Sequence, residues 1–183
     1  MTPLSRSILA AIVIPLVVGL DQWSKFLVLN EPRFNALGCL DGIQGCGQIE
    51  VSQMFDLSML WNRGMSFGAL QSDGVMRWVL VLATIAISVG FAIWLAQVAR
   101  RLSAFALTLV IGGAIGNVID RVRFGAVVDF LDFSGIWPPY FFNYVFNIAD
   151  AAITVGAVLL FFDQFILSRR GQSAPHTASG PEV

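Results

Sequence analysis

The chain has 183 residues, a length suited to one compact domain. Its hydrophobic fraction is 56% and its charged fraction only 13%, against about 25% charged residues in average usage, so it lacks the polar side chains needed to cover a water-facing surface. Eleven Lys and Arg against twelve Asp and Glu give a formal charge of −1, which argues against a nucleic-acid partner. The composition therefore predicts an integral membrane protein.

Four apolar runs reach the length of roughly 20 residues that a helix needs to cross a bilayer. They cover residues 4–29, 75–99, 102–119 and 144–167. The second and third are joined only by Arg100-Arg101 and their neighbours, so these two spans must form an antiparallel hairpin. In the third run, Gly112 and Gly116 form a G-x-x-x-G pattern, which is typical of a close helix-packing face. The sequence predicts an all-α, four-span membrane domain over residues 1–168.

The first run has one alternative interpretation, a cleaved signal peptide, because Arg6 precedes an apolar stretch. Such a stretch should be followed by small residues at a cleavage site. The residues that follow are instead Asp21-Gln22-Trp23-Ser24-Lys25. We therefore expect an uncleaved span.

The connection 31–74 between the first two spans is the longest. Phe55, Leu57, Met59 and Trp61 alternate with mostly polar residues, and this period of two predicts a half-buried strand. We expect a small β cradle outside the membrane. Cys39 and Cys46 lie in the same connection, and the sequence leaves open whether they form a disulfide.

An even number of spans places both ends of the domain on one side of the membrane. Basic residues are divided almost equally between the two sides, but the pairs Arg100-Arg101 and Arg169-Arg170 lie in short segments flush with span ends, where the positive-inside rule is strongest. We therefore expect the termini to be cytoplasmic. The polar, small-residue-rich segment 169–183 is predicted to be a disordered tail.

Ionisable side chains at membrane depth are costly and usually functional. Asp21 and Lys25 are four residues apart, so a helix places them on one face as an ion pair. Two further groups have helical spacing, and the topology brings all three to the outer end of the bundle. Their members are Asn117, Asp120 and Arg121 in the third span, and Asn147, Asp150 and Thr154 at the start of the fourth.

Asp129 and Asp150 are the pair with the clearest chemistry. One follows the third span and the other opens the fourth, and because these spans are antiparallel both carboxyls fall at a similar depth. Two close carboxylates in a low dielectric share a proton, so one can act as base toward water while the other acts as acid. Spacing alone leaves open that they are structural carboxylates paired with Arg121, Arg123 or Lys25.

Other catalytic schemes fit the sequence less well. Gly64-Met65-Ser66-Phe67-Gly68 matches a nucleophile-elbow pattern, but the sole histidine, His176, lies in the tail. A Ser–Lys pair would need Lys25 as base, and Asp21 one turn away favours its charged form. One histidine and the absence of an H-E-x-x-H motif argue against a bound metal. A proton- or ion-coupled carrier is the non-enzymatic alternative, but its binding residues belong near the midplane rather than at one end.

Five motifs in order give the chain a resemblance to a known family. They are Asp21-Gln22-Trp23-Ser24-Lys25, Asn62-Arg63-Gly64-Met65-Ser66-Phe67-Gly68, Gly116-Asn117-Val118-Ile119-Asp120-Arg121, Gly125-Ala126-Val127-Val128-Asp129-Phe130 and Phe146-Asn147-Ile148-Ala149-Asp150-Ala151. Together they resemble the motif series of the bacterial lipoprotein signal peptidases, the signal peptidase II family of membrane aspartic peptidases, over about residues 8–167. The segment around Cys39–Cys46 departs from the family by its greater length.

The resemblance implies a four-span enzyme of the bacterial inner membrane with its active site at the periplasmic face. Such enzymes remove signal peptides from diacylglyceryl-modified prolipoproteins, cutting on the N-terminal side of the lipidated cysteine. It implies a catalytic role for Asp129 and Asp150. The residues it implies as binding substrate or supporting the site are Asn62, Gly64, Asn117, Asp120, Arg121, Asn147, Asp21 and Lys25.

This chemistry needs water activated by one aspartate and no covalent intermediate, so we expect neither a cofactor nor a metal. Trp61, Trp137 and Phe141 are candidates for an apolar wall that excludes bulk water from the scissile bond. The expected partners are the lipid-modified substrates and membrane lipid, and we expect the chain to act as a monomer.

Overall fold

The computed structural model describes residues 1–39, 46–64, 74–134 and 144–167. Within them, four helices are long and apolar enough to cross a membrane, as predicted. They are α1 (Pro3–Leu29), α3 (Val75–Gln97), α4 (Arg101–Phe124) and α5 (Ile148–Phe161), and α5 continues into a π-helical turn, η3 (Phe162–Leu167).

Two helix boundaries differ from the predicted ones. α4 does not end at residue 119 but continues to Phe124, because the charge of Asp120 is buried against a partner helix rather than exposed to lipid. Gly125, whose φ is 78°, follows as a left-handed C-cap. α5 begins at Ile148 rather than 144, because Val145 and Phe146 pair with a strand.

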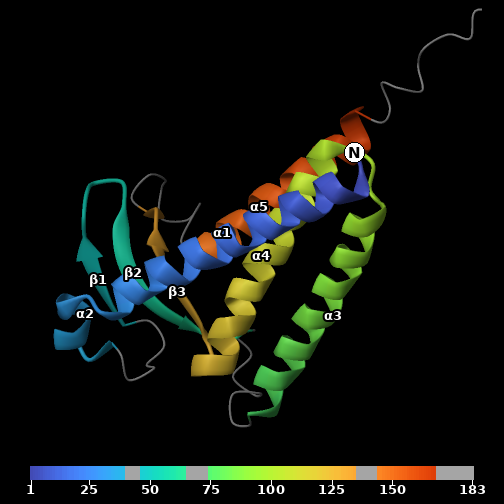
Figure 1. Ribbon diagram of the computed structural model, residues 1–183. Coiled ribbons are helices and arrows are strands. Elements are labelled where there is room, and N and C mark those ends of the chain that lie inside the picture. Colours follow the sequence, from blue (N-terminus) through green and yellow to red (C-terminus); the bar gives the residue numbers. More distant parts are fainter. Residues whose placement is uncertain (40–45, 65–73, 135–143, 168–183) are drawn as a thin grey trace, which may run out of the picture.

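Helix α4 is the centre of the bundle and packs against α1, α3 and α5 (Figure 1). The predicted G-x-x-x-G face is confirmed: a Cβ at Gly112 would lie 2.9 Å from the Val17 side chain of α1, and one at Gly116 would lie 2.6 Å from the Asp21 carboxylate. Gly113 makes the corresponding approach to α5, where a Cβ would lie 2.4 Å from the Ala149 carbonyl oxygen. Small residues thus let three helix backbones meet closely.

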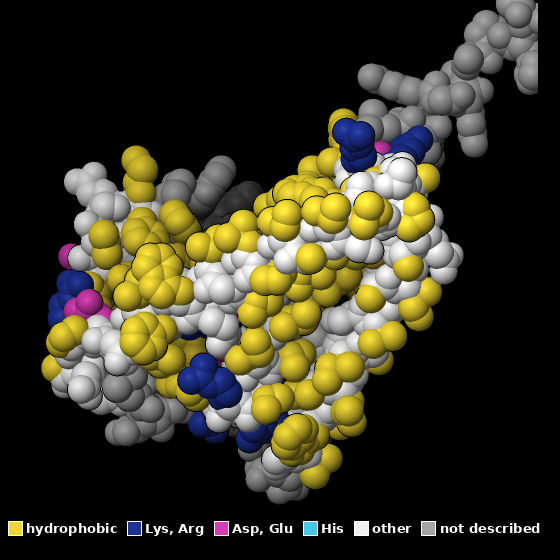
Figure 2. Space-filling view, viewed as in Figure 1, with side chains coloured by type: hydrophobic (Ala, Val, Ile, Leu, Met, Phe, Trp, Pro, Cys, Tyr) yellow, Lys and Arg dark blue, Asp and Glu magenta, His cyan; other side chains and the backbone are white. Residues whose placement is uncertain are grey.

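The outer surfaces of α1 and α3 carry exposed apolar side chains along their length, such as Ile12 and Leu16 on α1 and Leu82 and Ile87 on α3. Figure 2 shows hydrophobic side chains, in yellow, over the surface of the bundle. A surface of this kind fits contact with lipid.

A four-stranded antiparallel sheet lies beyond one end of the bundle (Figure 1). Its strands are β1 (Cys46–Glu50), β2 (Asp56–Asn62), β3 (Val127–Asp132) and β4 (Val145–Phe146), in that order. The predicted strand in the first connection is confirmed as β2, with Met59 and Trp61 buried. The sheet is larger than predicted, because the α4–α5 connection adds β3 and β4.

The first connection also contains a short helix, α2 (Pro32–Ala36), which places the fully buried Phe34 in the core of the sheet. Cys39 and Cys46 form a disulfide, with their Cα atoms 5.2 Å apart. The Trp61 indole nitrogen donates a hydrogen bond of 2.8 Å to the Cys39 carbonyl. The disulfide therefore joins α2 to the edge of the sheet, and Trp61 serves as a core residue of this layer.

The opposite end of the bundle is joined by polar contacts. Arg6 donates to the Val98 carbonyl at 2.6 Å, so the start of α1 lies against the α3–α4 connection. Arg100 contacts the buried Asp163 of η3 at 3.0 Å, and Ser103 donates a hydrogen bond to the same carboxylate. The α3–α4 hairpin is confirmed by the packing of these two helices against each other (Figure 1). This end of the molecule has its own buried acid, Asp163.

The close contact at Gly113 leads to a stability prediction. Gly113→Ala places a methyl group against the backbone of α5, and overpacking of this kind costs about 1–3 kcal/mol, so we expect a lower unfolding temperature in detergent. Gly90→Ala is the matched control, because a Cβ at Gly90 of α3 meets nothing within 4 Å. A better helix former should leave the unfolding temperature unchanged or raise it. Equal behaviour of the two variants would contradict the packing argument.

Candidate active site

Asp129 lies on β3, just beyond the end of α4, and its side chain is 1% exposed. Its two carboxylate oxygens accept hydrogen bonds from two asparagines, from Asn147 at 2.6 Å and from Asn62 at 3.0 Å. Asn62 reaches it from the neighbouring strand, because β2 pairs with β3 so that Leu60 opposes Asp129 and Asn62 is its diagonal neighbour on the same face. The pairing of β2 with β3 therefore holds the Asn62 donor against one oxygen of the Asp129 carboxylate.

Asp150 lies in the first turn of α5, where it forms a capping box with Asn147. The Asn147 side chain accepts from the Asp150 backbone N–H at 2.9 Å, and the Asp150 carboxylate accepts from the Asn147 backbone N–H at 3.4 Å. The other carboxylate oxygen accepts from the Asn117 side chain of α4 at 2.8 Å. The start of a helix thus fixes the rotamer of the second acid.

Asn147 connects the two carboxyl groups. The same side-chain nitrogen that donates to Asp129 also lies 3.2 Å from the Asn117 amide oxygen, and Asn117 donates to Asp150. The two aspartates therefore share one continuous hydrogen-bond network that runs through Asn147 and Asn117.

Next to these asparagines lies a cluster of buried charges. The Lys25 ammonium is 2.8 Å from Asp21 and 2.6 Å from Asp120, and all three side chains are at most 2% exposed. The predicted pair Asp21–Lys25 is confirmed, and the third-span acid joins it. Lys25 also donates to the Asn117 amide oxygen at 3.3 Å. Because an ammonium can only donate, this contact turns the amide nitrogen of Asn117 toward Asp150.

The two acids of this cluster also bind backbone groups directly beside the aspartate pair. Asp120 accepts from the backbone N–H of Val128, the residue before Asp129, at 3.2 Å. Asp21 accepts from the backbone N–H of Ala149, the residue before Asp150, at 3.0 Å. The Lys25 ammonium joins these two anchors. It therefore fixes β3 and the start of α5 relative to each other.

Gln22 is part of this arrangement, although sequence reasoning did not select it as a site residue. Its side chain donates to Asp120 at 2.9 Å and lies 3.3 Å from the Gly116 carbonyl. The available signal was a polar residue next to Asp21 in an apolar run. Thr154, which helical spacing places with Asn147 and Asp150, is instead exposed.

Arg121 and Gly64 complete the predicted set. The charge of Arg121 acts on Asp150, Asp129 and Asp120, and its guanidinium lies 3.5 Å from the Asn117 carbonyl. Its Nε is buried and has no hydrogen-bond partner among the described residues. Gly64 has a φ of 82° and donates its N–H to the Asn62 amide oxygen at 2.9 Å. This turn leaves the Asn62 amide nitrogen directed at Asp129.

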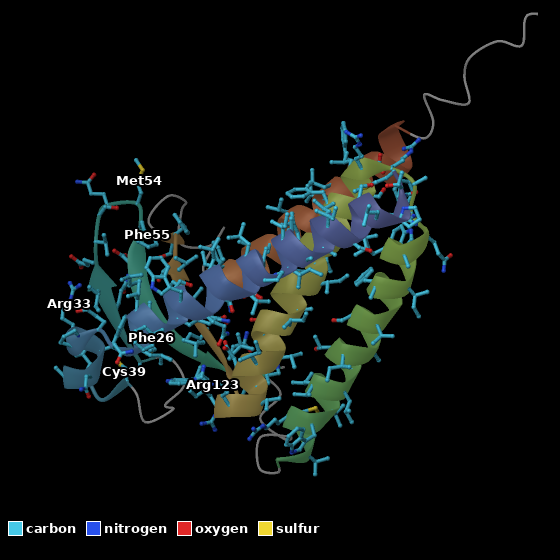
Figure 3. The ribbon with its side chains drawn as sticks, viewed as in Figure 1. Phe26, Arg33, Cys39, Met54, Phe55 and Arg123 are labelled. Atoms are coloured by element: carbon cyan, nitrogen blue, oxygen red, sulfur yellow. A yellow bond between two sulfur atoms is a disulfide. The ribbon has the colours of Figure 1, made fainter. Side chains whose placement is uncertain are left out.

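Structural ion pairing was the alternative explanation for the aspartate pair. In the described part of the chain, Lys25 forms ion pairs with Asp21 and Asp120, and no ion pair within 4.0 Å involves Asp129 or Asp150. Arg123 contacts Gln22 at 3.4 Å and stacks on Phe124 at the end of α4 (Figure 3). Asparagine amides, and not cations, are the hydrogen-bond donors to both acids.

Burial raises the pKa of Asp129 to about 7, and the nearby charge of Asp150 adds to the effect. The two asparagine hydrogen bonds oppose this rise and do not cancel it. Near neutral pH this group is therefore close to half protonated, as an acid–base pair requires.

Several residues of the sequence-based predictions lie outside the described ranges. They are Ser66 of the elbow-like pattern, Trp137 and Phe141 of the proposed apolar wall, and His176 with the rest of the tail 169–183. Over the described residues, no group of three or more His, Cys, Asp or Glu side chains is arranged to hold a metal ion.

A bundle of four apolar helices, with two aspartates in one asparagine network and a buried charge cluster at one end, defines a multi-pass membrane protein with a polar site at one end of its spans. A family model described as signal peptidase (SPase) II matches residues 13–166. The chain belongs to the signal peptidase II family, and it is accordingly a membrane-bound protease.

Individual relatives agree with this. The chain is 40% identical over 168 residues to a lipoprotein signal peptidase of Rhodopseudomonas palustris (strain TIE-1), covering 91% of this chain and 95% of the relative. It is 39% identical over 159 residues to one of Caulobacter vibrioides, covering 86% and 87%. A solved bacterial membrane enzyme superposes with a TM-score of 0.68 at 26% identity, covering 86% of this chain and 92% of that one.

The Lys25 cluster leads to a prediction that separates positioning from stability. Asp120→Asn weakens the contact with Lys25 and the anchor of Val128, so Asp129 shifts, and a displacement of about 1 Å can cost about 100-fold in turnover. We expect peptidase turnover to fall by about this factor in assays run well below the unfolding temperature.

Asp163→Asn is the matched control, since Asp163 is an equally buried acid with an arginine and a serine partner at the other end of the bundle. It should lower the unfolding temperature and leave turnover at the unmodified level. Equal losses of turnover in both variants would show that Asp120 acts only through stability.

Proposed function

We propose that this protein cleaves the signal peptide from diacylglyceryl-modified bacterial prolipoproteins, on the N-terminal side of the lipidated cysteine, using Asp129 and Asp150 to activate water. The observation that carries the proposal is the buried aspartate pair itself: two acids in one asparagine network, one of them with a pKa of about 7. The printed names of the relatives supply the substrate class.

The environments of the two acids suggest their roles. Asp129 is the member that holds the proton, because burial raises its pKa. Asp150 carries the negative charge, since it lies in the first turn of α5, where a helix stabilises an anion. Asp150 takes a proton from water as the water attacks the scissile carbonyl, and Asp129 donates its proton to the carbonyl oxygen. The tetrahedral intermediate collapses as Asp150 gives the proton it took from water to the leaving amine and Asp129 takes back the proton from the hydroxyl oxygen, so both acids return to their starting states and no covalent enzyme intermediate forms.

Arg121 and Asn62 are the proposed contacts to the substrate backbone. The Arg121 Nε is buried without a partner in the described part of the chain, so a peptide carbonyl bound there would satisfy a donor that is otherwise costly to bury. Asn62 lies at the end of β2 beside the same carboxyl and is only partly buried. Asn62 thus borders Asp129, and the charge of Arg121 acts on both members of the pair.

The position of the pair suits a lipid-anchored substrate. Asp129 follows the end of α4 and Asp150 opens α5, so both lie at the membrane surface rather than at its midplane. A diacylglyceryl cysteine keeps its acyl chains in the bilayer and its peptide bond at this depth. Arg100 and Arg101 lie at the opposite end of the bundle and favour a cytoplasmic location for that end. The active site then faces the periplasm from the inner membrane. We further propose that the chain acts as a monomer.

Replacing either aspartate tests the assignment. Asp129→Asn and Asp150→Asn each remove an ionisable group from the pair. General acid–base catalysis contributes about 100- to 10,000-fold to the rate. We therefore expect each variant to cleave a lipidated prolipoprotein in detergent at least about 100-fold more slowly. Asp132→Asn is the control, because Asp132 lies three residues further along β3 and bonds Ser58 and Ser134 instead. Near-normal turnover by either dyad variant would refute the mechanism.

The raised pKa of Asp129 predicts how activity depends on pH. Above about pH 7 this carboxyl loses the proton that it must donate, so kcat/KM for a lipidated peptide should fall about tenfold per pH unit on the alkaline side. A profile that stays flat to pH 9 would contradict the proton-donor role.

Stability provides an independent readout of the same proton. The pKa of Asp129 in the folded protein lies above its ordinary value of 3.8. Protonation of this group therefore contributes its full stabilisation of the fold below about pH 4, and that contribution is lost as pH rises through about 7. The unfolding temperature should fall across this window, and Asp129→Asn, which mimics the protonated form, should flatten the decline.

A further inference from the structure

A groove of about 240 Å³ lies between the first turns of α1 and the last turns of α3, at the end of the bundle opposite the aspartate pair. Its walls are mostly small or apolar. Its lining includes Arg6, Ser7 and Ala10 of α1, and Ala92, Leu95 and Ala96 of α3. The alanines leave the space between the two helices, and both helices present exposed apolar faces of the kind that contacts lipid. The groove therefore has an apolar interior.

Positive charge gathers at the end of the bundle where this groove lies. Arg6 lines the groove and donates a hydrogen bond to the Val98 carbonyl. Because this carbonyl is neutral, the contact does not offset the positive charge of Arg6. Val98 is followed within three residues by the exposed Arg100 and Arg101. Figure 2 shows Lys and Arg side chains in dark blue at the end of the bundle where the N-terminus lies.

Only part of this charge is neutralised within the described residues. Asp163 pairs with Arg100 at 3.0 Å, and neither Arg6 nor Arg101 has a carboxylate within 4.0 Å in that part of the chain. α4 also begins here at Arg101 without a side-chain N-cap, which adds the positive end of a helix dipole.

We propose that this groove binds one anionic phospholipid, with its phosphate at Arg6 and Arg101 and an acyl chain between Ala10 and Ala96. The complementarity has two parts. Basic residues between membrane helices bind anionic headgroups at the interface, and the small-residue walls admit a hydrocarbon chain below it. A free phosphate satisfies only the first part, and a zwitterionic lipid carries a choline that offsets its phosphate. The site is distinct from the peptidase centre, so it does not depend on the proposed function.

The experiment is native mass spectrometry of the full chain in detergent, titrated separately with phosphatidylglycerol, phosphatidylcholine and inorganic phosphate. We expect one tightly retained phosphatidylglycerol, weaker retention of phosphatidylcholine, and no retention of inorganic phosphate. One arginine near a lipid headgroup is worth about fivefold in affinity. Arg6→Gln and Arg101→Gln should therefore each weaken phosphatidylglycerol binding about fivefold and leave phosphatidylcholine nearly unchanged.

A second variant tests the groove itself. Ala96→Phe fills the space while keeping every charge, so it should weaken both lipids. Arg33→Gln and Ala83→Phe are the matched controls: Arg33 is an exposed arginine at the far end of the molecule, beside the sheet (Figure 3), and Ala83 is an exposed position of α3 outside the groove. Both controls should retain phosphatidylglycerol as the unmodified chain does.

Three results would overturn the proposal. The first is equal retention of the two lipids by the unmodified chain, and the second is phosphatidylglycerol retention that none of Arg6→Gln, Arg101→Gln and Ala96→Phe alters. The third is a dimer of this chain that Ala96→Phe dissociates, which would make a second copy the occupant. Because Arg101 is exposed, its variant keeps the test valid even where Arg6→Gln lowers stability.

Discussion

The arrangement of this protein depends on the contact of one lysine ammonium with two carboxylates inside the bundle. Lys25 lies within 2.8 Å of Asp21 and 2.6 Å of Asp120, and these two acids each hold a backbone N–H next to one member of the aspartate pair. Burying one cation with two anions is expensive unless every group is satisfied. Here the extra hydrogen bonds from Gln22, Val128 and Ala149 supply that satisfaction. The charge cluster therefore connects α1, α4, β3 and α5 at one point.

The close helix contacts make this cluster feasible. Gly116 has no Cβ to occupy the position of the Asp21 carboxylate, and Gly113 has none to separate α4 from the start of α5. With larger residues at these positions the helices would stand further apart, and the reach of Lys25 and Asn117 would no longer span the gap. The small residues that let the helices pack closely therefore also allow the polar groups at the end of the bundle to reach one another.

The sequence predicted the spans and the partners that obey helical periodicity. Asp21 and Lys25 follow from a spacing of four, and the face formed by Gly112 and Gly116 follows from the same rule. The sequence does not predict β3, because its run Val127–Asp132 is short and lies in the connection between two spans. The anchoring of Val128 and Ala149 was also beyond sequence reasoning, since backbone N–H groups leave no residue-type signal. The catalytic roles of Asp129 and Asp150 stay predictions that rest on geometry and family membership.

Asn147 links the formation of the last spanning helix to the assembly of the aspartate pair. It caps α5, bonds Asp129 and helps to fix Asp150, so the same residue starts the final spanning helix and joins the two aspartates in one hydrogen-bond network. A ribosome delivers this residue after the first three spans and Asp129 are already made. Until α5 packs against α4, Asp129 lacks the hydrogen bond from Asn147, and Asp150 lacks the one from Asn117. The order of the elements along the chain therefore makes the aspartate network the last part of the polar cluster to form.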